Sequence, residues 1–121
     1  MPHCILEYSA NIADTPDWRQ LFLKLHTRLA ATGQFQLADI KSRAVCHEVH
    51  FSGDGAQDRA FITLNIQMLD GRSDEVKKEI SALAAELVAG FFPLSMKNQK
   101  TSITVQICDI HRASYQRRVS Y

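Results

Sequence analysis

The strongest constraint on this chain is a strand–helix–strand pattern that occurs twice, in the halves 1–52 and 58–110. Two strands joined by a helix pair in parallel through a right-handed crossover. A glycine-containing turn between the halves then reverses the direction of the chain. The sequence therefore predicts an α+β fold. Its single domain, 1–121, contains tandem βαβ units in one four-stranded mixed sheet with two helices on one face, followed by a tail, 111–121.

The first half begins with an apolar segment, His3 to Ser9, which predicts a strand. Thr15 is the expected N-cap of a helix, with Pro16 at the first helical position and Gly33 as its left-handed end. A second strand is expected over residues 40–51. The helix is predicted from an apolar stripe with a spacing of three or four residues, formed by Trp18, Leu21, Phe22, Leu25 and Leu29.

The second half repeats this order, with strands expected over 59–69 and 102–110. Ser73 is the natural N-cap of the helix between them, because Asp74 and Glu75 place negative charge in its first turn. Pro93 is expected just past the end of this helix. Its buried face is predicted to contain Val76, Ile80, Leu83, Ala84, Leu87, Val88 and Phe91.

This topology brings distant residues to one edge of the sheet. The first two strands start at that edge and the third strand, which is antiparallel to them, ends there. Pro2 opens the first strand, Lys41 and Arg43 open the second on one face, and Arg72 follows the third. The N-terminus of the second helix faces the same edge and favours anions. We therefore expect a binding site for a small anion with several charges.

Pro2 adds a candidate base to this site. If Met1 is removed, the Pro2 nitrogen becomes a secondary amine at the start of a rigid strand. A free terminal amine titrates near ~8, much closer to neutrality than the ~10.4 of a lysine. Held in a cationic pocket, it would act as a general base at neutral pH.

Three segments of the chain are similar to segments of a known protein family: MPHCILEYSANI at the start, LAATGQFQLADIKSR in the middle, and GRS at Gly71–Ser73. Together they resemble the 5-carboxymethyl-2-hydroxymuconate isomerases of the tautomerase superfamily, which also contains 4-oxalocrotonate tautomerase and macrophage migration inhibitory factor. The resemblance covers roughly residues 2–110. It implies a homotrimer of tandem βαβ units with active sites near the subunit interfaces.

The resemblance also implies residue roles and a reaction. Pro2 matches the catalytic proline and Arg72 matches the arginine of the GRS segment. Lys41 stands where arginine is expected, which keeps the charge but loses the planar two-pronged grip on a carboxylate. The implied reaction turns a 2-hydroxymuconate-type dienol polycarboxylate into its 2-oxo-ene isomer during homoprotocatechuate breakdown, with Arg43 as a further binding residue. It needs no metal or organic cofactor.

Composition narrows the remaining classes of function. The net charge of +1 is too small to indicate nucleic acid as the main partner. The sequence contains no run of 18 apolar residues, so no membrane-spanning helix is expected. The three cysteines, Cys4, Cys46 and Cys108, form no Cys-x-x-Cys pair, which favours reduced thiols in a cytoplasmic protein.

The sequence is also compatible with two alternatives to an enzyme. Cys46, Glu48 and His50 alternate onto one face of the second expected strand and resemble a metal-ligand set, although a structural zinc normally needs four ligands. His47 and His50 point to opposite faces in such a strand. A tautomerase-fold module without isomerase activity is the other alternative, in which the basic tail and the open sheet face bind a protein or nucleic acid.

Overall fold

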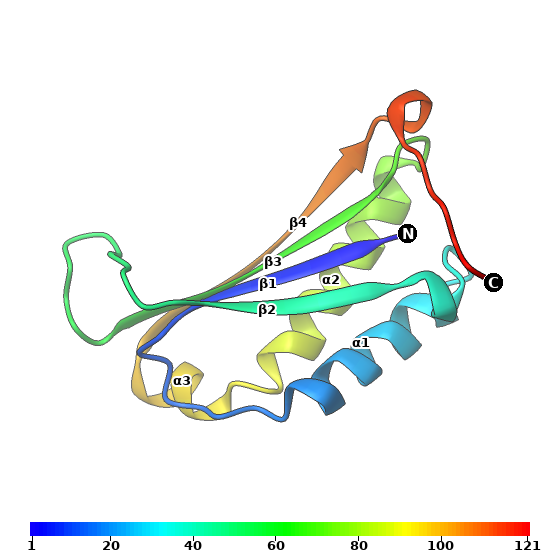
Figure 1. Ribbon diagram of the computed structural model, residues 1–121. Coiled ribbons are helices and arrows are strands. Elements are labelled where there is room, and N and C mark those ends of the chain that lie inside the picture. Colours follow the sequence, from blue (N-terminus) through cyan, green and yellow to red (C-terminus); the bar gives the residue numbers. More distant parts are fainter.

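The computed structural model describes residues 1–121 and has one four-stranded mixed sheet with all helices on the same face (Figure 1). The predicted α+β architecture is confirmed. No helix is both long enough and apolar enough to cross a membrane. In chain order the elements are β1 (His3–Ser9), α1 (Trp18–Ala31), η1 (Leu37–Asp39), β2 (Lys41–His47), β3 (Arg59–Leu69), α2 (Asp74–Ala89), α3 (Pro93–Asn98), β4 (Lys100–Ile110) and η2 (Arg112–Ser114).

The strand order is β2-β1-β3-β4, so the N-terminal strand lies inside the sheet. β1 pairs in parallel with β2 and antiparallel with β3, and β3 pairs in parallel with β4. His3 lies opposite both Lys41 and Gln67, and Leu69 lies opposite Ile110. The starts of β1 and β2 and the ends of β3 and β4 therefore meet at one edge, as the topology predicted for the first three strands.

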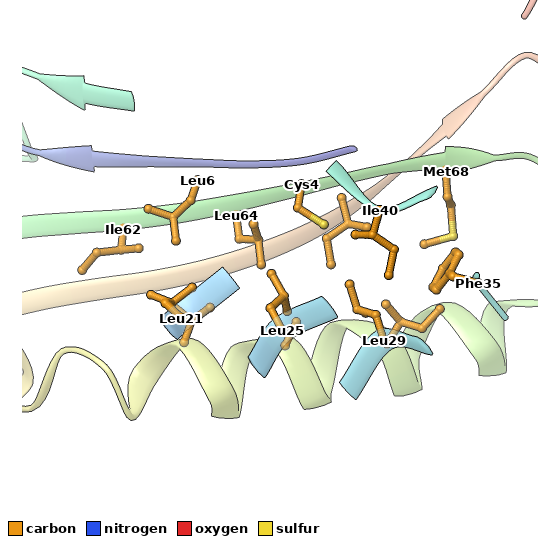
Figure 2. Packing of buried hydrophobic residues seen from close by; sticks show 14 of the residues in the cluster. Cys4, Leu6, Leu21, Leu25, Leu29, Phe35, Ile40, Ile62, Leu64 and Met68 are labelled. Atoms are coloured by element: carbon orange, nitrogen blue, oxygen red, sulfur yellow. The ribbon is translucent and has the colours of Figure 1, made fainter. Parts of the chain in front are cut away.

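The core lies between the sheet and the two long helices (Figure 2). Leu21, Leu25 and Leu29 of α1 are fully buried, which confirms the apolar stripe predicted for that helix. The sheet supplies alternate residues of β1 and β3, and α2 supplies every fourth residue of its inner face. The remaining fully buried apolar residues of these elements are Cys4, Leu6, Ile62, Leu64, Ile66, Met68, Ile80, Ala84 and Val88.

Two boundaries in the first half differ from the prediction. Asp17, not Thr15, caps α1, because its carboxylate accepts a hydrogen bond from the Gln20 N–H; the helix therefore starts at Trp18, after Pro16. β2 ends at His47, earlier than expected, and residues 48–58 form a loop in which Arg59 donates to the Asp54 carboxylate at 2.7 Å. Gly33 follows α1 with φ of 79°, the left-handed conformation predicted for it.

The second half also departs from the prediction near Pro93. Ser73 caps α2 as expected, but α2 ends at Ala89, so Phe91 lies beyond it. Pro93 does not only follow the helix: it starts a further helix, α3. Asp14 causes this, because its carboxylate accepts the N–H groups of Leu94 at 3.1 Å and Ser95 at 2.7 Å. β4 then begins at Lys100, two residues early.

The other face of the sheet carries no helix. A shallow hollow of about 370 Å³ lies on it, lined mainly by polar side chains of β1, β3 and β4. Asn65, at the centre of β3, faces this hollow, and its Oδ1 is buried with no hydrogen-bond partner. Nδ1 of His3 is likewise buried and unpartnered. Buried polar atoms normally have a partner in the protein or in ordered water.

Candidate active site

Pro2 is fully buried at the start of β1. Its carbonyl oxygen accepts the Lys41 N–H at 3.1 Å, which extends the β1–β2 ladder to the sheet edge. While Met1 is attached, the Pro2 nitrogen is an amide and the free amine belongs to Met1. That amine donates to the Asp39 carbonyl oxygen at 3.1 Å. The chain terminus is therefore fixed between the ends of β1 and β2.

The surroundings of this amine favour its neutral form. Burial lowers the pKa of the Met1 amine below its ordinary value; Asp39 acts in the opposite direction, and Lys41, Arg117 and Arg72 lower the pKa further. An amine with a lowered pKa has a larger neutral fraction at pH 7, which is the form that accepts a proton. Three cations from distant parts of the sequence therefore act on the chain terminus.

Lys41 and Arg43 both lie on the helix-free face of β2, but at different distances from the sheet edge. Lys41 lies at the edge beside Pro2, and its Nζ donates to the Asp39 carbonyl oxygen at 3.3 Å. Arg43 lies opposite Ile5, one residue pair further from the edge along the face. Its charge lowers the pKa of His3, after the larger effect of burial. The structure thus groups Lys41 closely with the terminus and places Arg43 on the adjoining sheet face.

Arg72 is held in place by neutral groups. It follows Gly71, whose φ of 111° is one that other residues rarely adopt. Nε and Nη2 donate to Oε1 and the carbonyl oxygen of Gln34 at 3.2 and 2.8 Å, and Nη1 donates to the Leu69 carbonyl oxygen at 3.1 Å. The guanidinium also lies 4.6 Å from the Phe35 ring centroid. Since no carboxylate pairs with it, its positive charge stays available to an anion.

The sequence reasoning missed several residues of this edge. Gln34 and Phe35 hold Arg72, and Asp39 accepts from both Met1 and Lys41. These three lie inside the segment LAATGQFQLADIKSR, but no residue pattern marked them individually. The signal for the tail was present in the topology, because β4 is parallel to β3 and ends at the same edge.

The tail completes this edge. Residues 115–121 line a cavity of about 440 Å³ together with His3 and Lys41. Arg117 contacts the Asp39 carboxylate at 2.9 Å, so the tail reaches the segment just before Lys41. Figure 1 shows the tail crossing the strand ends beside the N-terminus. This cavity is therefore cationic, and two of the cations that line it, Lys41 and Arg117, also lower the pKa of the Met1 amine.

The metal-ligand alternative rested on a longer β2. Because β2 ends at His47, Glu48 and His50 do not alternate along a strand. Cys46 Sγ contacts Glu48 Oε1 at 3.8 Å, His47 pairs with Glu7 at 3.4 Å, and His50 packs edge-on against Phe61. No three or more His, Cys, Asp or Glu side chains gather in a way that could hold a metal ion.

Comparison with known proteins agrees with this geometry. The family model described as 5-carboxymethyl-2-hydroxymuconate isomerase matches residues 2–119. The chain belongs to this isomerase family. It is 33% identical over 111 residues to the 5-carboxymethyl-2-hydroxymuconate Delta-isomerase of Escherichia coli, covering 92% of this chain and 88% of that protein. The sequence-based resemblance and the expectation of an isomerase are confirmed.

Solved structures support the same assignment. A 5-carboxymethyl-2-hydroxymuconate isomerase from Deinococcus radiodurans R1 superposes with a TM-score of 0.86 at 27% identity, over 97% of this chain and 88% of that one. A symmetric trimer of fused 4-OT gives 0.69 at 17% identity, over 92% and 87%. The second likeness shows the fold alone. The tautomerase-like fold predicted from the sequence is thereby confirmed.

Proposed function

We propose that this isomerase converts 5-carboxymethyl-2-hydroxymuconate into its 2-oxo-ene isomer, with the Pro2 nitrogen as general base after removal of Met1. The free amine takes the proton of the 2-hydroxyl group. The electron pair moves through the conjugated diene, and the same proton returns to a remote carbon, so no oxidant or reductant is needed. The conjugated substrate delocalises the charge, and the proposed reaction uses no cofactor.

Basic residues hold the substrate carboxylates in this proposal. Arg72 and Lys41 act at the sheet edge, and Arg43 acts from the adjoining face. The observation that carries the proposal is the guanidinium of Arg72, which is fixed by neutral acceptors and free of any carboxylate, and which lowers the pKa of the Met1 amine, one residue from the nitrogen that removal of Met1 would free. A fixed unpaired cation near an amine whose pKa is lowered suits a substrate that is both an anion and an acid.

Assembly is part of the same proposal. We infer a homotrimer, because the helix-free sheet face carries buried polar atoms without partners and needs a cover. The trimeric 4-OT neighbour supports this inference. All three cysteines are free, in keeping with the cytoplasmic location that the sequence led us to expect.

The decisive experiment compares proteins that differ only at the terminus. Protein shown by intact mass to lack Met1 should ketonise the dienol. The reaction is measured as the loss of the dienol's ultraviolet absorbance. Protein that retains Met1, prepared by inhibiting methionine removal, should be inactive because its proline nitrogen is an amide. Pro2→Ala should keep the fold and a terminal amine but lose at least about 100-fold in kcat.

Two outcomes would refute this mechanism. Equal activity with and without Met1 would exclude the Pro2 nitrogen as the base, and so would full activity in Pro2→Ala. The binding-module alternative predicts instead that neither form turns over the dienol and that the protein binds nucleic acid in a salt-dependent way.

A further inference from the structure

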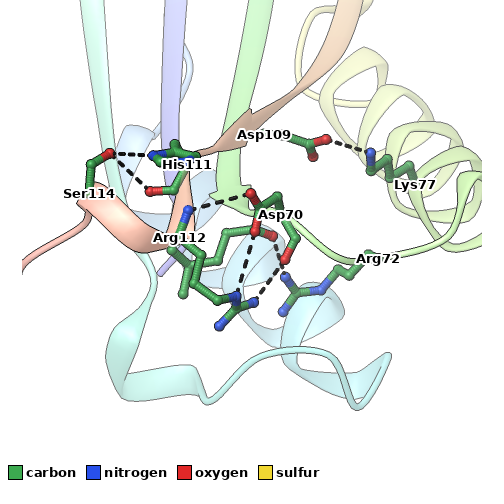
Figure 3. Close-up of polar contacts among 8 residues, drawn as sticks. Asp70, Arg72, Lys77, Asp109, His111, Arg112 and Ser114 are labelled. Atoms are coloured by element: carbon green, nitrogen blue, oxygen red, sulfur yellow. Dashed lines mark hydrogen bonds and ion pairs between the residues drawn. The ribbon is translucent and has the colours of Figure 1, made fainter.

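The C-terminal tail is fixed to the rest of the molecule at two points on either side of the pocket. At its start, Arg112 Nη2 donates to the Asp70 carbonyl oxygen at 2.8 Å, and Arg112 Nε lies 3.6 Å from the Asp70 carboxylate (Figure 3). Near its end, Arg117 Nη2 donates to the Asp39 carboxylate at 2.9 Å. The first point precedes Arg72 by two residues and the second precedes Lys41 by two. The tail therefore connects the two segments that carry the site cations.

Arg117 is the fixed cation of this tail. Its Nη2 donates to the Asp39 carboxylate and also to the Tyr121 hydroxyl at 3.3 Å. These two acceptors fix the position of the guanidinium. Nε and Nη1 donate to no protein atom. The side chain is 39% exposed and lines the 440 Å³ cavity with His3 and Lys41. Arg117 therefore lines this cavity with two nitrogens that have no protein acceptor, and its charge also acts on the Met1 amine.

The proposed substrate needs one more cation than a plain muconate does. A 2-hydroxymuconate carries two carboxylates, and the carboxymethyl arm adds a third. Arg72 and Lys41 account for two anionic groups at the edge, whereas Arg43 lies on the adjoining sheet face and does not line the cavity that Arg117 lines. We propose that Arg117 binds the third carboxylate, on the carboxymethyl arm, and thereby sets a preference for tricarboxylates over dicarboxylates. This inference rests on the proposed function and extends it to a residue of the tail.

Steady-state kinetics on two dienols test this role. Arg117→Ala should lower kcat/KM for 5-carboxymethyl-2-hydroxymuconate about 10- to 100-fold, mainly through KM, because a charge-assisted hydrogen bond is lost. For 2-hydroxymuconate, which lacks the arm, the change should stay below about 3-fold. Arg117→Lys keeps the charge and should fall between the wild type and Arg117→Ala. Equal losses on both dienols, or no loss on either, would overturn the proposal.

Two control variants separate position from charge. Arg19→Ala removes an exposed cation from the first turn of α1 and should leave kcat/KM unchanged for both substrates. Arg118→Ala removes the neighbouring cation of the tail, which lines the cavity but has no carboxylate to fix it. The proposal requires a clearly smaller loss of preference for Arg118→Ala than for Arg117→Ala. Equal losses would indicate a diffuse charge effect and would reject the assignment to Arg117.

A binding measurement keeps this inference separate from the proposed reaction. Propane-1,2,3-tricarboxylate and glutarate differ by one carboxylate and neither is turned over. The wild type should bind the tricarboxylate at least about 10-fold more tightly in calorimetry, and Arg117→Ala should abolish that difference. A wild type that turns over neither dienol refutes the proposed function, whereas absence of the tricarboxylate preference, or its survival in Arg117→Ala, refutes the role of Arg117.

Discussion

The Arg72 guanidinium lies 4.6 Å from the centroid of the Phe35 ring. That ring is only 7% exposed and belongs to the hydrophobic core, so it cannot move independently of the fold. Together with the backbone carbonyl groups of Gln34 and Leu69, it fixes where the charge of Arg72 lies. The core thus determines the position of the cation that we propose to bind the substrate.

Phe35→Leu should therefore weaken substrate binding. Loss of the cation–π contact, worth about 0.5–2 kcal/mol, and of its positioning should raise KM several-fold with a smaller change in kcat. Phe91→Leu is the matched control, because Phe91 makes a similar contact with Lys24 at 5.5 Å on the helical side. It should leave KM unchanged. An unaltered KM in Phe35→Leu would show that the ring does not position Arg72.

The pH dependence of kcat/KM should respond to the charges around the amine. The base must be neutral, so activity falls as the pH drops through the pKa of the amine in the free enzyme. Lys41 lowers the pKa of the Met1 amine. The Pro2 amine lies one residue further along the chain, so we expect Lys41→Gln to raise the pKa of this base and to move the acid limb to higher pH. Profiles for the wild type and the variant, with Met1 removed from both, provide the measurement.

Asp39→Asn provides the opposite shift. Asp39 raises the pKa of the terminal amine, so removing its charge should lower the pKa and move the acid limb to lower pH. A general loss of structure would lower both profiles without moving them in opposite directions. Limbs that coincide in the wild type and both variants would mean that the terminal amine is not the titrating base.

The stability of the fold should depend on the Asp14 carboxylate. Burial raises the pKa of this carboxyl, but hydrogen bonds from Ser95 and Leu94 outweigh that effect and lower it below its ordinary value. Its contribution is then complete above the unfolded pKa of about 4 and is lost as the pH falls through the lower folded pKa. Asp14→Ala should cost about 2 kcal/mol at pH 7 and less at pH 3.

Urea unfolding at the two pH values measures this difference. Asp17→Ala is a useful comparison, because Asp17 caps α1 through one hydrogen bond at an exposed position and should cost about 1 kcal/mol at pH 7. A cost for Asp14→Ala that is equal at pH 7 and pH 3 would contradict the role of its ionised form.

The helix-free face should control assembly. Asn65→Lys places a charge at the centre of the face that we propose to be covered in the trimer, and burying an unpaired charge is costly. Light scattering should give about three times 13.7 kDa for the wild type and 13.7 kDa for the variant. Gln20→Lys, on the exposed side of α1, should remain a trimer. A trimeric Asn65→Lys would show that assembly uses another surface.

Local patterns predicted most of the fold. The bounds of β1 and β3 agree with the prediction because both are apolar segments with clear alternation, and Ser73 is the only good cap before α2. α3 could not be predicted locally. It depends on Asp14, whose carboxylate caps it from about 80 residues away. Pro93 alone therefore indicated the end of one helix and not the start of another.

The site, like the fold, could be predicted only in part. Parallel and antiparallel pairing was enough to bring Pro2, Lys41 and Arg72 to one edge, because strand direction follows from the connections. The contacts that fix these residues were out of reach. Arg117 meets Asp39 across 78 positions, and the tail has no hydrophobic period that would reveal its path.

The central place of β1 has a consequence for how the enzyme matures. The segment that leaves the ribosome first is the one whose two neighbours, β2 and β3, are made much later. Until they arrive, the first residues are an open peptide on which an aminopeptidase can act. Once the sheet has formed, Pro2 is enclosed and the bond before it is difficult to reach. Slow synthesis of β2 would thus favour removal of Met1. Rapid folding would preserve a chain that, under the mechanism we propose, is inactive.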